Sequence, residues 1–339
     1  MSIHDVKPFP VGDMMGGAAA PLLQVRGLTV SVPSQRGPVT VVDGVDLDIG
    51  DGETLCLVGE SASGKSLTAL SLLGLQGDRI TSRGAIHFGG RDLMTLDERA
   101  MAALRGREIA MIFQEAVPAL NPIHRIGRQL TEALMQDGTM GRRAARQRSK
   151  ELMQQVGIRD ASARLAAFPH QFSGGMAQRV MIAMALAQAP ALLIADEPTT
   201  ALDVTIQAQI LDLLADLRQQ QGLAMLLITH DMGVVAETAD RVAVMYAGRI
   251  VETAPVHALF AAPAHPYTAA LLAARPGFDD HAAPTPIGGE PPDPGNRPAG
   301  CAFAPRCARA TDLCQSIAPT TRHLGNRSFA CHHPHMVAA

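Results

Sequence analysis

The stretch GESASGKS, residues 59–66, follows the short apolar run TLCLV and precedes a helical pattern. It matches the spacing G-x-x-x-x-G-K-S/T, in which glycines let backbone N–H groups curl around phosphates at a helix N-terminus. Lys65 can reach the β- and γ-phosphates of a nucleotide, and the Ser66 hydroxyl can hold Mg²⁺. The stretch therefore predicts a nucleotide-binding phosphate loop made of Gly59, Glu60, Ser61, Ala62, Ser63, Gly64, Lys65 and Ser66.

The alternative interpretation of this motif is a glycine-rich turn that matches the spacing by chance. A second motif in the same chain argues against that alternative. LLIADE, residues 192–197, is an apolar run that ends in two carboxylates. Adjacent strand residues point to opposite sides, so the two acids can have different roles. We expect Asp196 to help hold Mg²⁺ and Glu197 to deprotonate the attacking water. Two solvated acids at a strand end are the alternative interpretation.

Composition limits the class of protein. Net charge is −3 over 339 residues, from 29 basic and 32 acidic side chains, which gives no electrostatic footprint for nucleic acid. The one basic cluster, RRAARQRSK at 142–150, is typical of a solvated helix face. No segment reaches the roughly 18 apolar residues of a membrane span, and acids and prolines interrupt the N-terminus, which argues against a signal peptide. We expect a cytosolic protein.

Strand and helix signals alternate from about residue 22 to 275. Buried apolar strands between helices predict an α/β fold of the P-loop NTPase type, with a mainly parallel core sheet and an early antiparallel β subdomain. A helical subdomain is expected at about 124–190, where no strand signal occurs. The predicted segments are a flexible leader (1–20), an ATPase domain (21–275), a Pro/Gly-rich linker (276–300) and an irregular Cys-rich region (301–339).

Four further motifs occur in a family order: MIFQE, FSGGMAQR (172–179), TALD (200–203) and LLITHD (226–231). With the phosphate loop they resemble ABC-type ATPases over about residues 22–275. The resemblance implies that Gln114 senses Mg²⁺ and the attacking water and that His230 contacts the γ-phosphate. Mg²⁺ would be held through Ser66, Gln114 and Asp196. The implied signature residues are Ser173, Gly174, Gly175 and Gln178, and Asp203 belongs to the D-loop.

Ser173 is a good N-cap before two glycines and a helical run, which exposes a helix N-terminus to a phosphate. In the family this helix faces the ATP of a second subunit. One phosphate loop and one signature cannot complete a site, so we expect two ATPase chains to join head to tail. Two positions depart from the family pattern: Ala62 replaces a glycine, which predicts modest strain, and Val32 stands where an aromatic normally stacks on the adenine.

The motifs NPIHRIGRQL, FPHQFSGGMAQRVMIAMALA and HPYTAALLAARP resemble the oligopeptide/dipeptide permease ATPases, as does the tail from GGEPPDPGNRP onward. The resemblance implies an ATP-hydrolysing subunit that powers import of peptides or similar small solutes. Its partners would be a second homologous ATPase, two integral-membrane permeases and an extracytoplasmic substrate-binding protein, with no nucleic acid. The chain would lie at the cytoplasmic face of the membrane. The alternatives are a soluble ABC ATPase, a nickel or glutathione importer, and an iron–sulfur redox protein that ATP regulates.

Four of the five cysteines lie in the tail: Cys301, Cys307, Cys314 and Cys331. Thiols in a cytosolic chain suggest metal ligation before disulfides. Their spacing lacks the C-x₂-C knuckle of common zinc sites, and four-cysteine ligation suits an iron–sulfur cluster. We expect a 4Fe–4S cluster, which the family resemblance also implies, that ties down a tail too poor in core residues to fold alone. Zn²⁺, helped by the neighbouring histidines, and free or paired thiols are the alternatives. Cys56 is expected to be a core residue.

Overall fold

The computed structural model describes residues 20–200, 202–274 and 285–335. Its central feature is an eight-stranded sheet with the order β11-β12-β10-β9-β3-β8-β7-β6. The five strands from β9 to β6 are mutually parallel, and β10, β12 and β11 extend the sheet antiparallel. The strands are β3 (Thr54–Val58), β6 (Ile109–Ile112), β7 (Leu192–Asp196), β8 (Ala224–Thr229), β9 (Arg241–Tyr246), β10 (Arg249–Pro255), β11 (Arg322–Leu324) and β12 (Arg327–Phe329).

The parallel strands are buried on both faces, which explains their continuous apolar sequences. Every residue of β3, β7 and β8 is buried. The α-helices outside the helical subdomain are α1 (Lys65–Leu72), α2 (Glu98–Leu104), α3 (Ala116–Ala119), α8 (Val204–Gln221), α9 (Met232–Thr238), α10 (Val256–Ala261), α11 (Pro266–Ala273) and, in the tail, α12 (Asp312–Ser316). The predicted mainly parallel core sheet is confirmed.

A second, antiparallel sheet has the order β2-β1-β4-β5. In its longer strands buried positions alternate in part with exposed ones, because one face packs on the core and the other meets solvent. This sheet is the early antiparallel subdomain that the sequence predicts. Its strands are β1 (Leu23–Val32), β2 (Val39–Ile49), β4 (Thr81–Phe88) and β5 (Arg91–Asp92).

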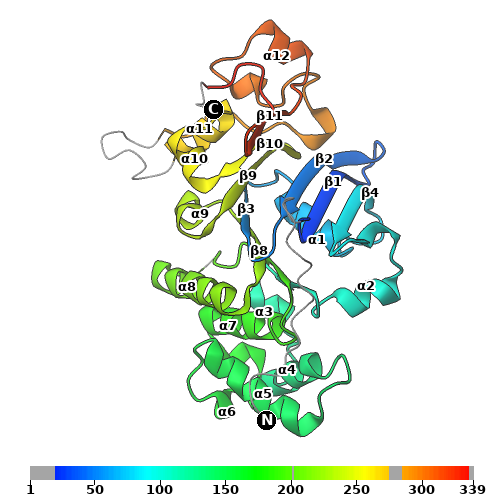
Figure 1. Ribbon diagram of the computed structural model, residues 1–339, viewed down its shortest axis with the longest axis vertical. Coiled ribbons are helices and arrows are strands. Elements are labelled where there is room, and N and C mark those ends of the chain that lie inside the picture. Colours follow the sequence, from blue (N-terminus) through cyan, green and yellow to red (C-terminus); the bar gives the residue numbers. More distant parts are fainter. Residues whose placement is uncertain (1–19, 201, 275–284, 336–339) are drawn as a thin grey trace.

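Residues 124–190 contain helices and turns but no strand. In α4 the residues Ile126, Leu130 and Leu134 recur at i, i+4 and i+8 and form one buried stripe, which packs on α5. The basic cluster at 142–150 lies on α5, whose arginines are mostly exposed, as a solvated helix face should be. The subdomain forms one end of the molecule in Figure 1 and comprises α4 (Ile126–Leu134), α5 (Arg142–Gln155), α6 (Ala161–Arg164) and α7 (Gly174–Ala185).

The Cys-rich tail lies at the opposite end and is joined to the core. Strand β12 pairs with β10 and so extends the main sheet. Phe303 is 3% exposed within the main core. Arg327 of β12 donates to the fully buried carboxylate of Glu252 on β10, which also accepts from two backbone N–H groups. Strand pairing and a buried ion pair therefore join the tail to the core, and the stabilising role expected of a cluster stays a prediction.

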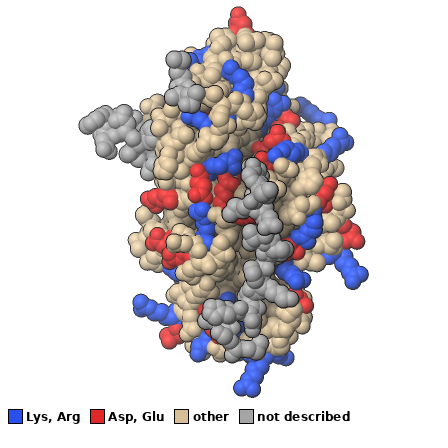
Figure 2. Space-filling view, in the orientation of Figure 1, with Lys and Arg blue, Asp and Glu red and all other residues tan. Residues whose placement is uncertain are grey.

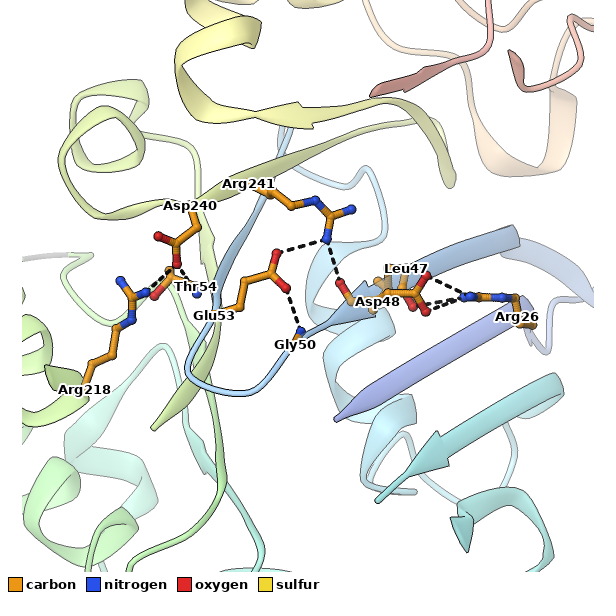
Figure 3. Close-up of polar contacts among 9 residues, drawn as sticks. All are labelled: Arg26, Leu47, Asp48, Gly50, Glu53, Thr54, Arg218, Asp240 and Arg241. Carbon is orange, nitrogen blue, oxygen red and sulfur yellow. Dashed lines mark hydrogen bonds and ion pairs between the residues drawn. The ribbon is translucent and has the colours of Figure 1, made fainter. Parts of the chain in front are cut away.

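Figure 3 shows the polar contacts that join the two sheets at the amino ends of β3 and β9. The Glu53 carboxylate accepts from the backbone N–H of Gly50 at 2.6 Å and from Arg241 at 3.0 Å. Asp240 accepts from the N–H of Thr54 and pairs with Arg218 of α8. The phosphate loop follows the opposite, carboxyl end of β3, so these contacts fix the strand beneath the loop at its amino end.

Charges of both signs are interspersed on the face shown in Figure 2, without a basic patch that dominates it. In the part of the chain that the structure describes, no helix is long and apolar enough to cross a membrane. The predicted leader, apart from residue 20, and residues 276–284 of the predicted linker lie outside the described residues.

Candidate ATP site

The phosphate loop connects the end of β3 with the start of α1. At Gly59, with φ 154°, an added Cβ would lie 2.1 Å from the carbonyl oxygen of Met245, so the close approach of two backbones requires glycine. Gly64 has φ 107° and caps α1 without a side-chain bond, which leaves the first N–H groups of the helix for a ligand. Ala62 has φ 62°, the left-handed conformation whose strain the sequence predicts.

Lys65, the first residue of α1, points back into the loop. Its Nζ donates to the carbonyl oxygens of Gly59 at 2.9 Å and Glu60 at 3.0 Å, and the residue is 5% exposed. Burial lowers the pKa of Lys65, while the nearby carboxylates of Glu197, Asp196 and Glu60 act in the opposite direction. The ammonium group is thus held in the loop by main-chain oxygens that a phosphate can replace.

Ser66 and Asp196 come together at the ends of α1 and β7. The Ser66 hydroxyl donates to Oδ1 of Asp196 at 3.1 Å. Burial raises the pKa of Asp196, the hydrogen bond from Ser66 lowers it, and Glu197 raises it further. A hydroxyl and a carboxylate are oxygen donors of the kind that Mg²⁺ prefers, so these two residues fit a magnesium ion that also binds the nucleotide. The ion would supply positive charge to the phosphates.

The carboxylate of Glu197 contacts two predicted site residues and one unpredicted one. Its Oε2 accepts from Gln114 at 3.3 Å and from Thr200 at 2.8 Å, and its Oε1 lies 3.4 Å from Nδ1 of His230. Residue 197 has φ 45°, a conformation that is rare for a non-glycine residue and common at functional sites. Its N–H bonds to the carbonyl of Ile228, so β8 fixes this turn.

The signature forms the N-terminus of α7. The hydroxyl of Ser173 caps this helix by accepting from the N–H of Met176 at 3.4 Å, and Ser173 and Gly174 are exposed. A Cβ on Gly175 would lie 2.6 Å from the side chain of Ile206, so the glycine lets α7 approach α8. Asp203 caps α8 by accepting from the N–H of Ile206 at 3.0 Å. The signature and the D-loop are therefore neighbours.

Gln178 is the one predicted signature residue that points inward. It is 3% exposed, and its Nε2 has no partner among the described residues. Contact between Gln178 and the nucleotide of a partner chain stays a prediction. This buried side chain would reach that nucleotide only if α7 turned. Val32 lies half-buried at the end of β1, paired with Val39 of β2, so its surroundings are aliphatic. Cys56 is fully buried in the core, as expected, and burial raises the pKa of its thiol to about 12.

Two residues that the sequence did not predict contact the phosphate loop from outside. Tyr267 of α11 accepts a hydrogen bond from the N–H of Glu60 at 2.9 Å. Arg306, in the tail, forms a bidentate ion pair with the carboxylate of Glu60 at 2.6 and 2.8 Å. Composition is the one sequence feature that could have pointed to these contacts. The chain has two tyrosines, Tyr246 and Tyr267, and their rings pack against each other.

The four tail cysteines line one small cavity, together with His265, His332 and His333. The cavity measures about 10 Å³, roughly the room of one water molecule. Burial raises the pKa of Cys301, and raises that of Cys331 to about 11, which favours protonated thiols in this packing. Among the described residues no group of three or more His, Cys, Asp or Glu side chains is placed to hold a metal ion. The sulfurs converge, but in this packing they do not fit a metal or cluster.

Comparison with known proteins agrees with this geometry. Residues 42–200 match the family described as ABC transporter, and residues 251–314 match the C-terminal region of the oligopeptide/dipeptide transporter family. The Bacillus subtilis (strain 168) oligopeptide transport ATP-binding protein AppD is 49% identical over 315 residues, which cover 91% of this chain and 96% of AppD. The chain belongs to the oligopeptide/dipeptide group of ABC transporter ATP-binding subunits.

The Escherichia coli (strain K12) dipeptide transport ATP-binding protein DppD is 46% identical over 317 residues, which cover 92% of this chain and 97% of DppD. The dimeric post-hydrolysis structure of the ATP-binding cassette MJ0796, bound to ADP and Pi, aligns with TM-score 0.63 at 26% identity and covers 69% of this chain and 98% of that one. This ABC-type subunit is an ATPase, which confirms the predicted enzyme class and fold.

Proposed function

We propose that this chain hydrolyses ATP to power the import of peptides or similar small solutes across a membrane. The observation that carries the proposal is the pairing, in one chain, of an ABC cassette with the oligopeptide/dipeptide C-terminal region. Relatives that are similar over almost their whole length are named for oligopeptide and dipeptide transport. Nickel complexes and glutathione are the alternative cargoes.

In this proposal each site residue keeps its predicted role. Lys65 and the loop N–H groups bind the triphosphate, and Ser66, Asp196 and Gln114 hold Mg²⁺ with it. Glu197 takes a proton from the attacking water, and His230 contacts the γ-phosphate. What supports these roles is the contact network: Glu197 lies within hydrogen-bond distance of Gln114, and Ser66 bonds to Asp196.

Ser173, Gly174, Gly175 and Gln178 of one chain would meet the ATP of another. The support is the exposed, serine-capped end of α7, next to Asp203 and the exposed apolar side chain of Val204, which is 84% accessible. The second chain is a homologous ATPase, and a second copy of this chain can fill that place. Two membrane permeases and an extracytoplasmic binding protein complete the importer, and this subunit lies at the cytoplasmic face of the membrane.

The cofactor proposed for the tail is a 4Fe–4S cluster, with Zn²⁺ as the alternative. Its support is the convergence of the four cysteines, from three different segments of the tail, on one cavity. In this packing no group of described residues is placed to hold a metal, so the metal-bound tail would need a different arrangement of these thiols, with the ligands deprotonated.

Uptake in cells whose only copy carries Lys65→Ala tests the transport proposal. Loss of labelled di- or oligopeptide uptake supports it, and loss of nickel or glutathione uptake alone reassigns the cargo. Co-purification from membranes separates the importer from a soluble ABC ATPase. A chain that never fractionates with a permease, in cells with unchanged uptake of all three solutes, contradicts the importer.

A further inference from the structure

Arg306 is a charged tail residue buried against the phosphate loop. Its side chain is 4% exposed, although it belongs to a short 3₁₀ turn, residues 304–306. Nη1 donates to Oε2 of Glu60 and to the hydroxyl of Tyr246, and Nη2 donates to Oε1 of Glu60. The carbonyl oxygens of Gly288 and Ile287 accept the remaining N–H groups. All five guanidinium donors therefore have an acceptor.

The partner of this arginine is the second residue of the phosphate loop. The carbonyl of Glu60 accepts from Nζ of Lys65 and from the N–H of Ser63, and its own N–H donates to Tyr267. The charge of Glu60 also acts on the Lys65 ammonium. The main chain of Glu60 thus belongs to the loop, while its side chain reaches out to the tail.

An aromatic cluster fixes Arg306 in this place. Tyr246, Tyr267 and Phe303 pack with ring centroids 4.5–5.4 Å apart, and the guanidinium lies 5.8 Å from the ring centre of Tyr246 and 6.0 Å from that of Phe303. These rings come from β9, from α11 and from the tail. The site is preorganised, because the arginine needs no rotamer change to meet Glu60.

A carboxylate in a phosphate loop opposes the binding of a triphosphate, because like charges repel more strongly where water is partly excluded. The ion pair that this carboxylate forms with a guanidinium has no net charge, and it anchors the loop. We propose that Arg306 is a positioning residue of the ATP site: it neutralises Glu60 and holds the phosphate loop open for ATP. The Cys-rich tail is then a working part of the nucleotide site.

A purely structural role for Arg306 makes a different prediction. If the ion pair only stabilises the fold, Glu60→Gln cannot repair the loss of Arg306, because it removes the same contact. If Arg306 neutralises a charge beside the phosphates, Glu60→Gln removes the charge that needs neutralising. The double variant therefore separates the two roles.

The test measures the ATP dissociation constant, KM and kcat of the full-length chain. Arg306→Gln should weaken ATP binding and raise KM at least roughly fivefold, within the usual range for coupling between sites, with kcat at saturating ATP retained. Arg306→Gln combined with Glu60→Gln should recover most of the lost affinity. ATP binding by Arg306→Gln equal to that of the parent, or no recovery in the double variant, overturns the proposal.

Arg309→Gln is the matched control, since Arg309 lies three residues further along the tail and bonds to His335 instead of the loop. It should bind ATP like the parent, and an equal loss in this variant overturns the proposal. Should Arg306→Gln fail to fold, Arg306→Lys is measured instead, because it keeps a positive charge opposite Glu60 while it loses the bidentate contact. Arg306→Lys should retain most of the parent's ATP affinity, and a loss of fivefold or more overturns the proposal.

Discussion

Oε1 of Glu197 lies 3.4 Å from Nδ1 of His230, at the carboxyl ends of the neighbouring strands β7 and β8. His230 is 63% exposed on its side chain and Glu197 only 16%. The histidine thus faces solvent, and its contact with a γ-phosphate stays a prediction. The glutamate is held behind it by Gln114 and Thr200. A carboxylate that is oriented from three sides is suited to the predicted role of base.

Glu197→Gln should bind ATP but hydrolyse it at least about 100-fold more slowly, because the amide cannot accept the proton of the water. Turnover and single-turnover phosphate release measure this effect. Glu237→Gln makes the same chemical change on an exposed glutamate of α9 and should leave the rate unchanged. Hydrolysis by Glu197→Gln at the parent's rate would mean that another group is the base.

Lys65→Ala should reduce ATP turnover by roughly 100-fold or more, because it removes the buried cation that faces the phosphates. Lys150→Ala, on the half-exposed side of α5, is the matched lysine control and should retain full turnover. Nucleotide binding followed by fluorescence or calorimetry completes the measurement. Normal binding and turnover in Lys65→Ala would contradict the assignment of the phosphate loop.

Ala62→Gly should stabilise the chain by about 0.5–1 kcal/mol. A left-handed alanine costs about 1–2 kcal/mol, and the greater freedom of glycine in the unfolded chain takes back part of that gain. Ala189 also has a positive φ, 50°, but is exposed and far along the chain from the loop. Ala189→Gly should raise the unfolding midpoint similarly without a change in ATP affinity. A lower midpoint for Ala62→Gly in denaturant would refute the strain.

Anaerobically purified chain should contain iron and acid-labile sulfide, which Cys307→Ser should lose. Cys56→Ser is the control, since Cys56 is buried in the sheet away from the tail cavity, and it should retain both. Metal analysis with a sulfide assay makes the distinction. Zinc without sulfide supports the alternative metal. If the parent contains neither iron nor zinc, the tail cysteines are free or paired thiols.

Sequence patterns predicted the parts of the fold that depend on local signals. The buried run at 192–197, the phosphate loop and the strand-free stretch at 124–190 each have a periodicity or spacing that a single segment displays. Strain at Ala62 was expected because the family pattern has a glycine there, and the φ of 62° shows the left-handed conformation on which that expectation depends.

What the sequence could not show depends on contacts between distant segments. Strands β11 and β12 have three residues each, too few for an alternating pattern, and they form because β10 offers a free edge. The pair between Arg306 and Glu60 spans 246 positions, and no local rule connects them. The same holds for the inward turn of Gln178, because a helix face is decided by what packs against it.

The central claim is that one chain supplies half of each ATP site, with Lys65 from one copy and Ser173 from another. The most direct measurement mixes Lys65→Ala chains with Ser173→Arg chains, in the assembly in which the parent hydrolyses ATP. Each variant alone should be inactive, and the mixture should regain turnover, because mixed pairs contain one intact composite site. Full turnover by Ser173→Arg alone, or no recovery on mixing, would contradict the account.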